Sequence, residues 1–128
     1  STRRAATAVE FALVAPVFFV FVFGLIEIGR AVMIQQCLTN AARVGCRHAV
    51  LATTTTDDQV KSVMQDHLRS AMPDPSVVTC DVTPENLFGI ASGSDVTVNA
   101  SVNFAELSWL PLGFLNPVIS SEAIQQRE

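Results

Sequence analysis

The chain changes its hydrophobic pattern along its length, and the longest apolar stretch lies near the N-terminus. Residues Phe11 to Ile26 carry no charge, and extending this run back to Ala5 gives 22 residues with one charge, Glu10. A helix of that length rises roughly 33 Å, close to the thickness of the hydrocarbon core of a bilayer. The pattern therefore predicts a membrane-spanning helix over about residues 6–30.

Two basic residues fix the expected orientation of this helix. Arg3 and Arg4 come directly before the apolar run, and the positive-inside rule then places the N-terminus in the cytoplasm. A cleaved secretory signal is the alternative, but the run is longer than a typical apolar core of a signal, and residues 27–30 form a poor cleavage site. We therefore expect everything after about Arg30 to lie across the membrane.

The helical pattern continues beyond the apolar run. Apolar positions recur at helical spacing from Ile28 to Ala42, and no proline occurs between Val17 and Pro73. The sequence predicts one helix over residues 6–51, apolar all round at first and amphipathic later. Glu27 and Arg30 stand three apart on one face of it, which predicts an ion pair where the membrane half ends.

A second helix and several strands follow, in a region that we expect to be a small head formed by residues 52–128. Thr53 to Thr56 break the long helix, and apolar spacing predicts an amphipathic helix over residues 57–72. The period then becomes two in three stretches, at residues 78–82, 96–104 and 118–127. The expected fold is α+β and pilin-like, with about three antiparallel strands packed on the second half of the long helix. Trp109 lies in an apolar loop that either covers the core or contacts a neighbour.

Charge and composition exclude several classes of protein. The net charge is −4, with an excess of three basic groups in residues 1–50 and of seven acidic groups in residues 51–128. Charged residues make up only 16% of the chain and apolar residues 49%, whereas about a quarter charged is usual for a soluble domain. Neither an ordinary cytosolic enzyme nor a nucleic-acid-binding protein is expected.

The chain has three cysteines, and their pairing indicates whether the protein lies in an oxidising compartment. Cys37 and Cys46 lie nine apart on one helix, on opposite faces, and so cannot bond to each other. Cys80 points to the core side of its strand, where the end of the long helix should pack. We predict a Cys46–Cys80 disulfide, as expected in an oxidising periplasm, and the alternative is two buried free thiols. Cys37 is then free or bonds to another subunit.

No arrangement of residues points to catalysis. Cys46 and His48 are two apart on a helix and face different ways, and His67 lies on an apolar stripe, so no metal site is expected. The carboxylates supply no nucleophile–base pair. We expect no catalytic residues, no metal and no cofactor.

Glu10 is the informative residue of the apolar helix. A carboxylate inside a membrane costs a few kcal/mol on insertion scales, which suggests a function and a partner. The alternative is that Glu10 lies near the interface beside Arg3 and Arg4 and is simply solvated.

Three stretches in register carry a family resemblance. They read RRAATAVEFALVAP at residues 3–16, FGLIEIGRA at residues 23–31 and QCLTNAARVG at residues 36–45. This pattern resembles TadE-like pseudopilins, the minor subunits of the tight-adherence (Tad) branch of type IV pili. The resemblance is close over about residues 3–50 and holds only in outline beyond them.

The resemblance implies a processing site. In that family a prepilin peptidase cuts on the cytoplasmic side, usually after a glycine, and leaves a glutamate at the fifth mature position. Transferred here, the cut falls between Ala5 and Ala6, residues 1–5 are the end of a leader peptide, and Glu10 is the fifth mature residue. Ala5 departs from the usual glycine. The new α-amino group of Ala6 could pair with Glu10 and set the axial register between subunits. We also expect the natural precursor to extend further upstream.

The function implied is structural. The resemblance implies a minor pilin of a Tad-type pilus, acting in pilus biogenesis, adhesion or secretion. It implies a place in the bacterial inner membrane with the head in the periplasm, and in the extracellular pilus after assembly. Expected partners are the prepilin peptidase, other pilin and pseudopilin subunits, the inner-membrane assembly platform and membrane lipid, and no nucleic acid. The alternative is a permanently membrane-anchored periplasmic binding or adaptor module that never enters a fibre.

Overall fold

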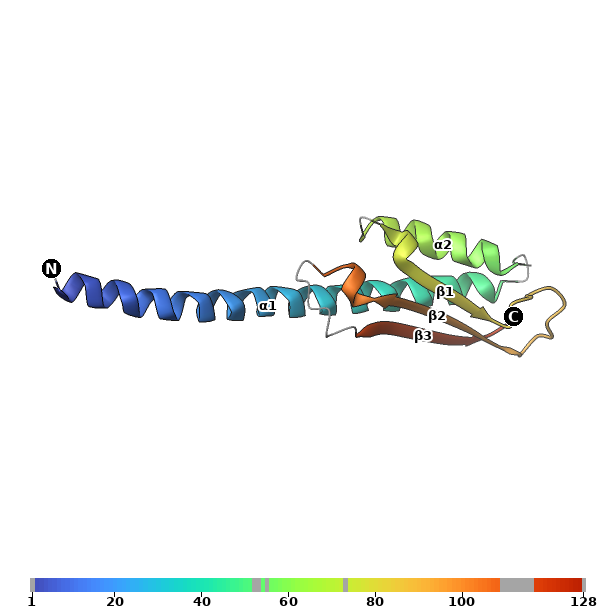
Figure 1. Cartoon of the computed structure of the whole chain (residues 1–128). Coiled ribbons are helices and arrows are strands. Elements are labelled where there is room, and N and C mark those ends of the chain that lie inside the picture. Colours follow the sequence, from blue (N-terminus) through green and yellow to red (C-terminus); the bar gives the residue numbers. More distant parts are fainter. Residues whose placement is uncertain (1, 52–53, 55, 73, 109–116, 128) are drawn as a thin grey trace. The chain divides into compact units, whose positions relative to one another are not determined.

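The computed structural model describes residues 2–51, 54, 56–72, 74–108 and 117–127. The chain forms two units, Ser1–Val32 and Met33–Glu128, which are treated separately below. The apolar loop with Trp109 lies outside the described residues. The elements, in chain order, are α1 (Thr2–Ala49), α2 (Asp57–Arg69), the 3₁₀ turn η1 (Pro75–Val77), β1 (Val78–Thr83), β2 (Asp95–Asn103), the 3₁₀ turn η2 (Phe104–Glu106) and β3 (Val118–Gln126). Figure 1 labels the two α-helices and the three strands.

The second unit contains a three-stranded antiparallel sheet in the order β1-β2-β3. Its register pairs Cys80 with Ala100 and Ala100 with Ser121. Alternate residues of β1 and β2 are buried, as the period of two predicts. The expectation of a pilin-like α+β fold with a small antiparallel sheet is confirmed.

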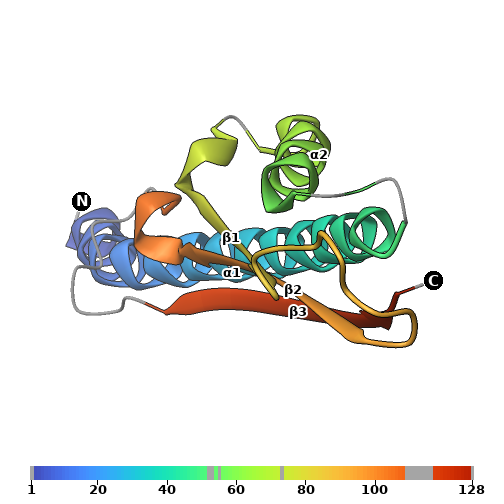
Figure 2. The ribbon, with the colours of Figure 1, turned by 90° about the vertical axis from the view of Figure 1, so that its right-hand side faces the viewer.

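Both helices of this unit pack on the same face of the sheet, so the unit has two layers (Figure 2). The part of α1 from Met33 onward supplies core residues at helical spacing, and α2 supplies one further stripe. Together with the inward residues of β1 and β2 they form one hydrophobic core. The helical residues of this core are Ile34, Leu38, Ala41, Ala42, Cys46, Ala49, Val60, Met64 and Leu68.

Polar contacts set the position of α1 along β3. Gln35 Nε2 donates to the carbonyl oxygen of Ser120 at 3.1 Å, and Ser121 Oγ donates to Thr39 Oγ1 at 3.0 Å. The later residue of the helix, Thr39, contacts the later residue of the strand, Ser121. α1 and β3 therefore run in the same direction in this unit, with Thr39 opposite Ser121.

Local charge and capping stabilise the start of α2. The backbone N–H of Thr56 donates to Gln59 Oε1 at 3.4 Å, as expected for one half of a capping box. Asp57 and Lys61 form an i,i+4 ion pair of 2.8 Å. Hydrogen bonding to Lys61 holds the pKa of the Asp57 carboxyl below its ordinary value. Because a carboxyl with a lowered pKa stabilises the fold in its ionised form, this contribution is lost as the pH falls through the folded-state pKa.

The second helix ends earlier than the sequence pattern predicts. It stops at Arg69, whereas the apolar spacing predicts Met72 as its last residue. The backbone N–H groups of Ala71 and Met72 both bond to the carbonyl of Leu68, which forms a turn instead of continuing the helix. Met72 precedes Pro73 in the sequence, and the residue before a proline is disfavoured in helical geometry.

A glycine allows α1 and α2 to approach closely. A Cβ atom on Gly45 would lie 2.6 Å from both Cγ and Sδ of Met64 and 3.4 Å from Cγ1 of Val60. The distance to Met64 is shorter than a van der Waals contact, so a side chain at position 45 requires either the Met64 side chain or the two helices to shift. Gly45 therefore leaves room for the Met64 side chain to pack directly against α1.

Replacing this glycine should loosen the core. We expect Gly45→Val to lower the free energy of opening of the second unit by about 1–3 kcal/mol, as overpacked core variants do. Hydrogen exchange of the β2 amides, measured on the full chain in detergent, reports this free energy. Ser62→Val, at an exposed position of α2, is the matched control and should change it little. Unchanged β2 protection in Gly45→Val would show that the helices are not closely packed at this point.

Candidate functional site

The first unit consists of the N-terminal part of α1, and its surface is almost entirely apolar. Large apolar side chains remain exposed all round this part of the helix. Monomeric soluble proteins rarely expose a contiguous apolar patch of more than a few hundred Å². The helix is long and apolar enough to cross a membrane. The exposed side chains are Val9, Phe11, Leu13, Val14, Val17, Phe18, Phe19, Val20, Phe21, Phe23, Leu25, Ile26, Ile28 and Val32.

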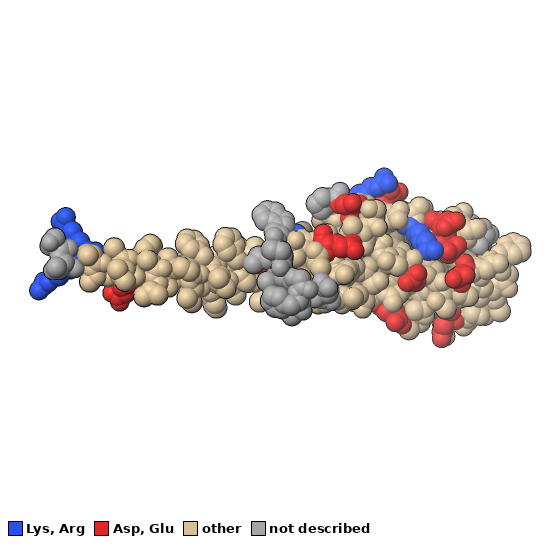
Figure 3. Space-filling view, viewed as in Figure 1, with Lys and Arg blue, Asp and Glu red and all other residues tan. Residues whose placement is uncertain are grey.

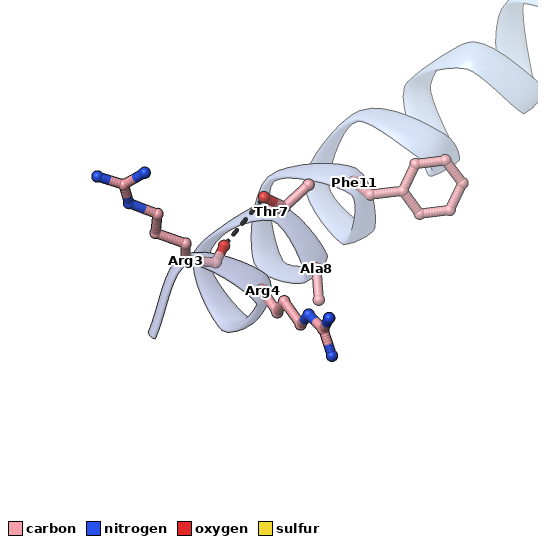
Figure 4. Close-up of a pocket in the computed structure, with 5 residues that line it drawn as sticks. All are labelled: Arg3, Arg4, Thr7, Ala8 and Phe11. Atoms are coloured by element: carbon pink, nitrogen blue, oxygen red, sulfur yellow. Dashed lines mark hydrogen bonds between the residues drawn. The ribbon is translucent and has the colours of Figure 1, made fainter. Parts of the chain in front are cut away.

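Basic and apolar side chains meet at the first turns of α1 (Figure 4). Arg3, Arg4, Thr7, Ala8 and Phe11 line a shallow open hollow on the helix surface. Arg3 and Arg4 project to different sides of the helix, and Thr7 Oγ1 donates to the carbonyl of Arg3 at 3.0 Å. A cationic end followed by an apolar face is the arrangement that a helix needs at the boundary between headgroups and acyl chains.

The residues of the expected processing site are accessible. Ala5 and Ala6 lie within the first turns of α1 and are both exposed. Glu10 is exposed as well, four residues after Ala6, so the two share one face of the helix. Cleavage between Ala5 and Ala6 stays a prediction.

The other charged pair of α1 lies near the end of this unit. Glu27 is buried and Arg30 is half-buried. Because the two stand three residues apart, they occupy neighbouring positions on the helix surface. The ion pair between Glu27 and Arg30 stays a prediction.

The predicted Cys46–Cys80 disulfide is wrong in this structure, because all three cysteines are free thiols. Cys80 pairs with Ala100 and hence lies at the level of Ser121, which contacts Thr39 of α1. Cys46 is seven residues further along α1, which is roughly 10 Å of helix rise. A disulfide requires Cα atoms about 4.4–6.8 Å apart.

Each buried thiol has a separate environment. Cys46 Sγ donates to the carbonyl of Val96 at 3.6 Å, four residues from Ala100 along β2. Burial raises the pKa of both the Cys46 and the Cys80 thiol, and Asp81 adds to the increase at Cys80. A thiol with a raised pKa forms little of the reactive thiolate at neutral pH. Cys46 and Cys80 therefore act as small core residues, and Cys37 is half-buried.

The structure assigns a role to Arg127 that the sequence pattern did not indicate. Its side chain is buried, and Nη2 donates to the carbonyl of Thr54 at 3.2 Å, which links the end of the chain to the connection between α1 and α2. Its backbone N–H donates to the carbonyl of Ser94, the residue directly before β2. Buried arginines are rare without a partner, but nothing in the local sequence marks this one as buried.

The described residues hold no group of three or more His, Cys, Asp or Glu side chains that could bind a metal ion. Instead, the chemistry of the first unit consists of a basic end, an accessible Ala5–Ala6 bond, and one carboxylate at the beginning of an apolar surface.

Fold and site together define the class of protein. A long N-terminal helix with an exposed apolar first part, a second helix and a three-stranded antiparallel sheet make this a pilin-like α+β protein. Residues 5–47 match the family described as TadE-like protein, in agreement with the resemblance seen in the sequence. The match covers about a third of the chain and takes in Ala5, Ala6 and Glu10. Neither the curated proteins nor the solved structures give a match.

The state of the cysteines can be tested by labelling. In the folded full chain we expect a maleimide reagent to modify Cys37 first, since Cys46 and Cys80 are buried and their thiols have raised pKa values. After denaturation without reductant, intact mass should show three labelled thiols. A single label under these conditions would show that Cys46 and Cys80 are bonded after all.

Proposed function

We propose that the protein is a minor pilin of a Tad-type pilus, with a structural role in assembly and no catalytic role. The observation that carries this proposal is the exposed apolar surface of α1 in the segment that matches the TadE-like family. Pilus biogenesis, adhesion or secretion is the wider process that the family name suggests.

The apolar surface of α1 requires an apolar environment. A row of fourteen large side chains, each more than half exposed, cannot remain in water as a monomer. Two environments can cover it, namely the hydrocarbon core of a membrane and a bundle of similar helices. A pilin uses both in turn, since its helix leaves the lipid when the subunit enters the fibre. Before assembly the chain is thus a single-pass protein of the inner membrane, with its head in the periplasm.

Glu10 is the proposed determinant of register in this exchange. Its carboxylate lies on the apolar part of α1, where it costs free energy unless a cation is near. A cut between Ala5 and Ala6 by a prepilin peptidase would create an α-amino group four residues away, within reach of Glu10 on the same chain or a neighbour. Pairing with that group favours one axial position of the incoming subunit over all others.

The rival proposal is a permanently anchored periplasmic binding or adaptor module. It is favoured by Ala5, which stands where the family usually has glycine, and by Arg3 and Arg4, which suit a cytoplasmic anchor if they are retained. In this case no amino group forms at Ala6, and Glu10 is solvated at the membrane interface. The two proposals therefore differ in what they require of Glu10.

Substitution of Glu10 separates the two proposals. We expect Glu10→Ala to insert into the membrane at least as well as wild type, since removing a charge lowers the cost of insertion. Incorporation into pili should fall about ten- to hundredfold, because a charge-assisted hydrogen bond of about 1.5–3 kcal/mol is lost. Immunoblots of membrane and sheared-pilus fractions measure both quantities.

The control is Thr7→Ala, a small change on the same part of α1 that removes only the bond to Arg3. It should leave both fractions as in wild type. Normal incorporation of Glu10→Ala into pili would contradict the role in register.

A further inference from the structure

The two outer surfaces of the second unit carry opposite charge. One is the exposed face of the sheet, and the other is the side of α1 that faces away from the sheet. Because α1 packs on the inner face of the sheet, these surfaces point in opposite directions.

The outer face of the sheet is acidic. It presents Asp81 of β1, Asp95 of β2 and Glu122 of β3, all exposed, and the three strands contain no lysine or arginine. The register aligns Asp81, Asn99 and Glu122 in one row across the sheet. In Figure 3, acidic side chains gather over the region where Figure 1 draws the strands. We call this surface the acidic sheet face.

One cation borders this surface and does not neutralise it. Lys61 of α2 lies near enough to Asp81 for that carboxylate to help raise the pKa of the lysine. Its main partner is Asp57, at 2.8 Å. Lys61 is thus already paired within α2, and Asp95 and Glu122 have no salt-bridge partner among the described residues.

The far side of α1 in this unit is basic. Arg43 and Arg47 are exposed, four residues apart, and Gln36 and Asn40 extend the same face toward Met33. The sequence from residue 33 to residue 56 contains no aspartate or glutamate. Neither arginine forms a salt bridge with any described residue. We call Gln36, Asn40, Arg43 and Arg47 the basic helix stripe.

The exposed side of α2 differs from both surfaces. There Lys61 pairs with Asp57 and Arg69 lies 3.4 Å from Asp66, so opposite charges are matched within the helix itself. Charges that are already paired within one molecule attract a partner molecule only weakly. Asp58, Asp74, Glu85 and Glu106 are exposed at other places on the unit and also lack a salt bridge among the described residues. The acidic sheet face and the basic helix stripe are the two surfaces on which several unpaired charges of one sign share a single face.

We propose that the acidic sheet face of one copy docks against the basic helix stripe of a second copy of this chain. The contact joins two different surfaces, so after the first contact one copy still has a free acidic sheet face and the other a free basic helix stripe. Such a heterologous contact does not close on itself in a pair, and it propagates into a ring or a helical filament. The contact is inferred from the charges of the two surfaces. Only its place in a pilus rests on the proposed function.

The size of the contact indicates what it contributes. Three strands of up to nine residues make a face of roughly 14 Å by 30 Å, about 400 Å². A stable interface usually buries about 800 Å² on each partner. The contact alone is therefore weak, and the apolar part of α1 supplies most of the affinity. Complementary charge then selects the neighbour and its orientation.

Disulfide trapping tests the geometry on the full chain in lipid nanodiscs that hold several copies. Asn40→Cys marks the basic helix stripe and Thr79→Cys marks the acidic sheet face, each on a Cys37→Ser background. When the two variants are mixed and oxidised, we expect a crosslink between Asn40→Cys and Thr79→Cys chains. Both positions are exposed, and each chain carries only one of the two introduced cysteines, so a crosslink between them joins two chains.

The matched control replaces Thr79→Cys with Ser62→Cys, on the exposed side of α2. This pair should give no crosslink above background. Crosslinks only between identical variants would show a symmetric contact and overturn the proposal. The absence of any crosslink between Asn40→Cys and Thr79→Cys would overturn it as well.

Charge reversal tests the cause of the contact. Arg43→Glu and Glu122→Lys, each alone, should reduce the yield of the trapped pair about fivefold, which corresponds to about 1 kcal/mol. A chain carrying both changes should regain part of the wild-type yield, because positions 43 and 122 then again carry opposite charges. Raised salt should weaken the wild-type contact. Failure of the double variant to recover would show that charge does not hold the contact.

Matched reversals elsewhere serve as controls. Arg69→Glu on α2 and Glu85→Lys beyond β1 change the net charge equally and should leave the yield unchanged. Loss of the contact with these variants would indicate an effect of net charge and overturn the proposal. Trapping does not depend on pilus formation, so a chain that crosslinks as expected yet never enters pili would refute the proposed function and leave this contact intact.

Discussion

The packing of α1 over the sheet is the interaction on which the second unit depends. Three short strands are only marginally stable without a partner on their apolar face. α1 supplies that partner through residues buried at helical spacing from Ile34 to Ala49, and most of them are small enough to let neighbours approach. Gly45 is the extreme case, because even a Cβ atom would collide with Met64. The fold of the head is therefore tied to the same helix that carries the apolar N-terminal surface.

This coupling explains how one helix can serve two purposes. Its first part presents apolar side chains that no described residue of its own unit covers, and it needs lipid or other helices. Its second part is amphipathic and already has a partner in the sheet. A subunit that moves from a membrane into a fibre can exchange the surroundings of the first part without disturbing the packing of the second. Polar contacts from Gln35 and Thr39 to β3 fix the sheet on the helix throughout.

Much of the fold could be predicted from the sequence because it depends on local periodicity. The long helix, the second helix and all three strands follow from spacing of apolar residues, and the structure confirms them. The processing site and the role of Glu10 were inferred from a motif that lies within residues 5–47. The family match supports the presence of this motif, but it does not test cleavage or the role of Glu10. The Cys46–Cys80 disulfide failed for a different reason. Strand parity and helix phase showed that both thiols face the core, but not that they lie at different levels along α1.

The same limit applies to other contacts between distant segments. Arg127 reaches Thr54 across 73 positions of sequence, and Gln35 reaches Ser120 across 85. Such contacts depend on the register between α1 and β3, which no local pattern specifies. The acidic sheet face shows the same point, since Asp81 and Glu122 become neighbours of Asn99 only through the pairing of strands.

The central claim is that the helix is a processed pilin helix and not a permanent anchor. The N-terminal residue of the protein recovered from its native membrane tests it most directly, by intact mass and mapping of the terminal peptide. Our account predicts a chain that begins at Ala6, with a free α-amino group beside Glu10. A chain that retains Arg3 and Arg4 would contradict it.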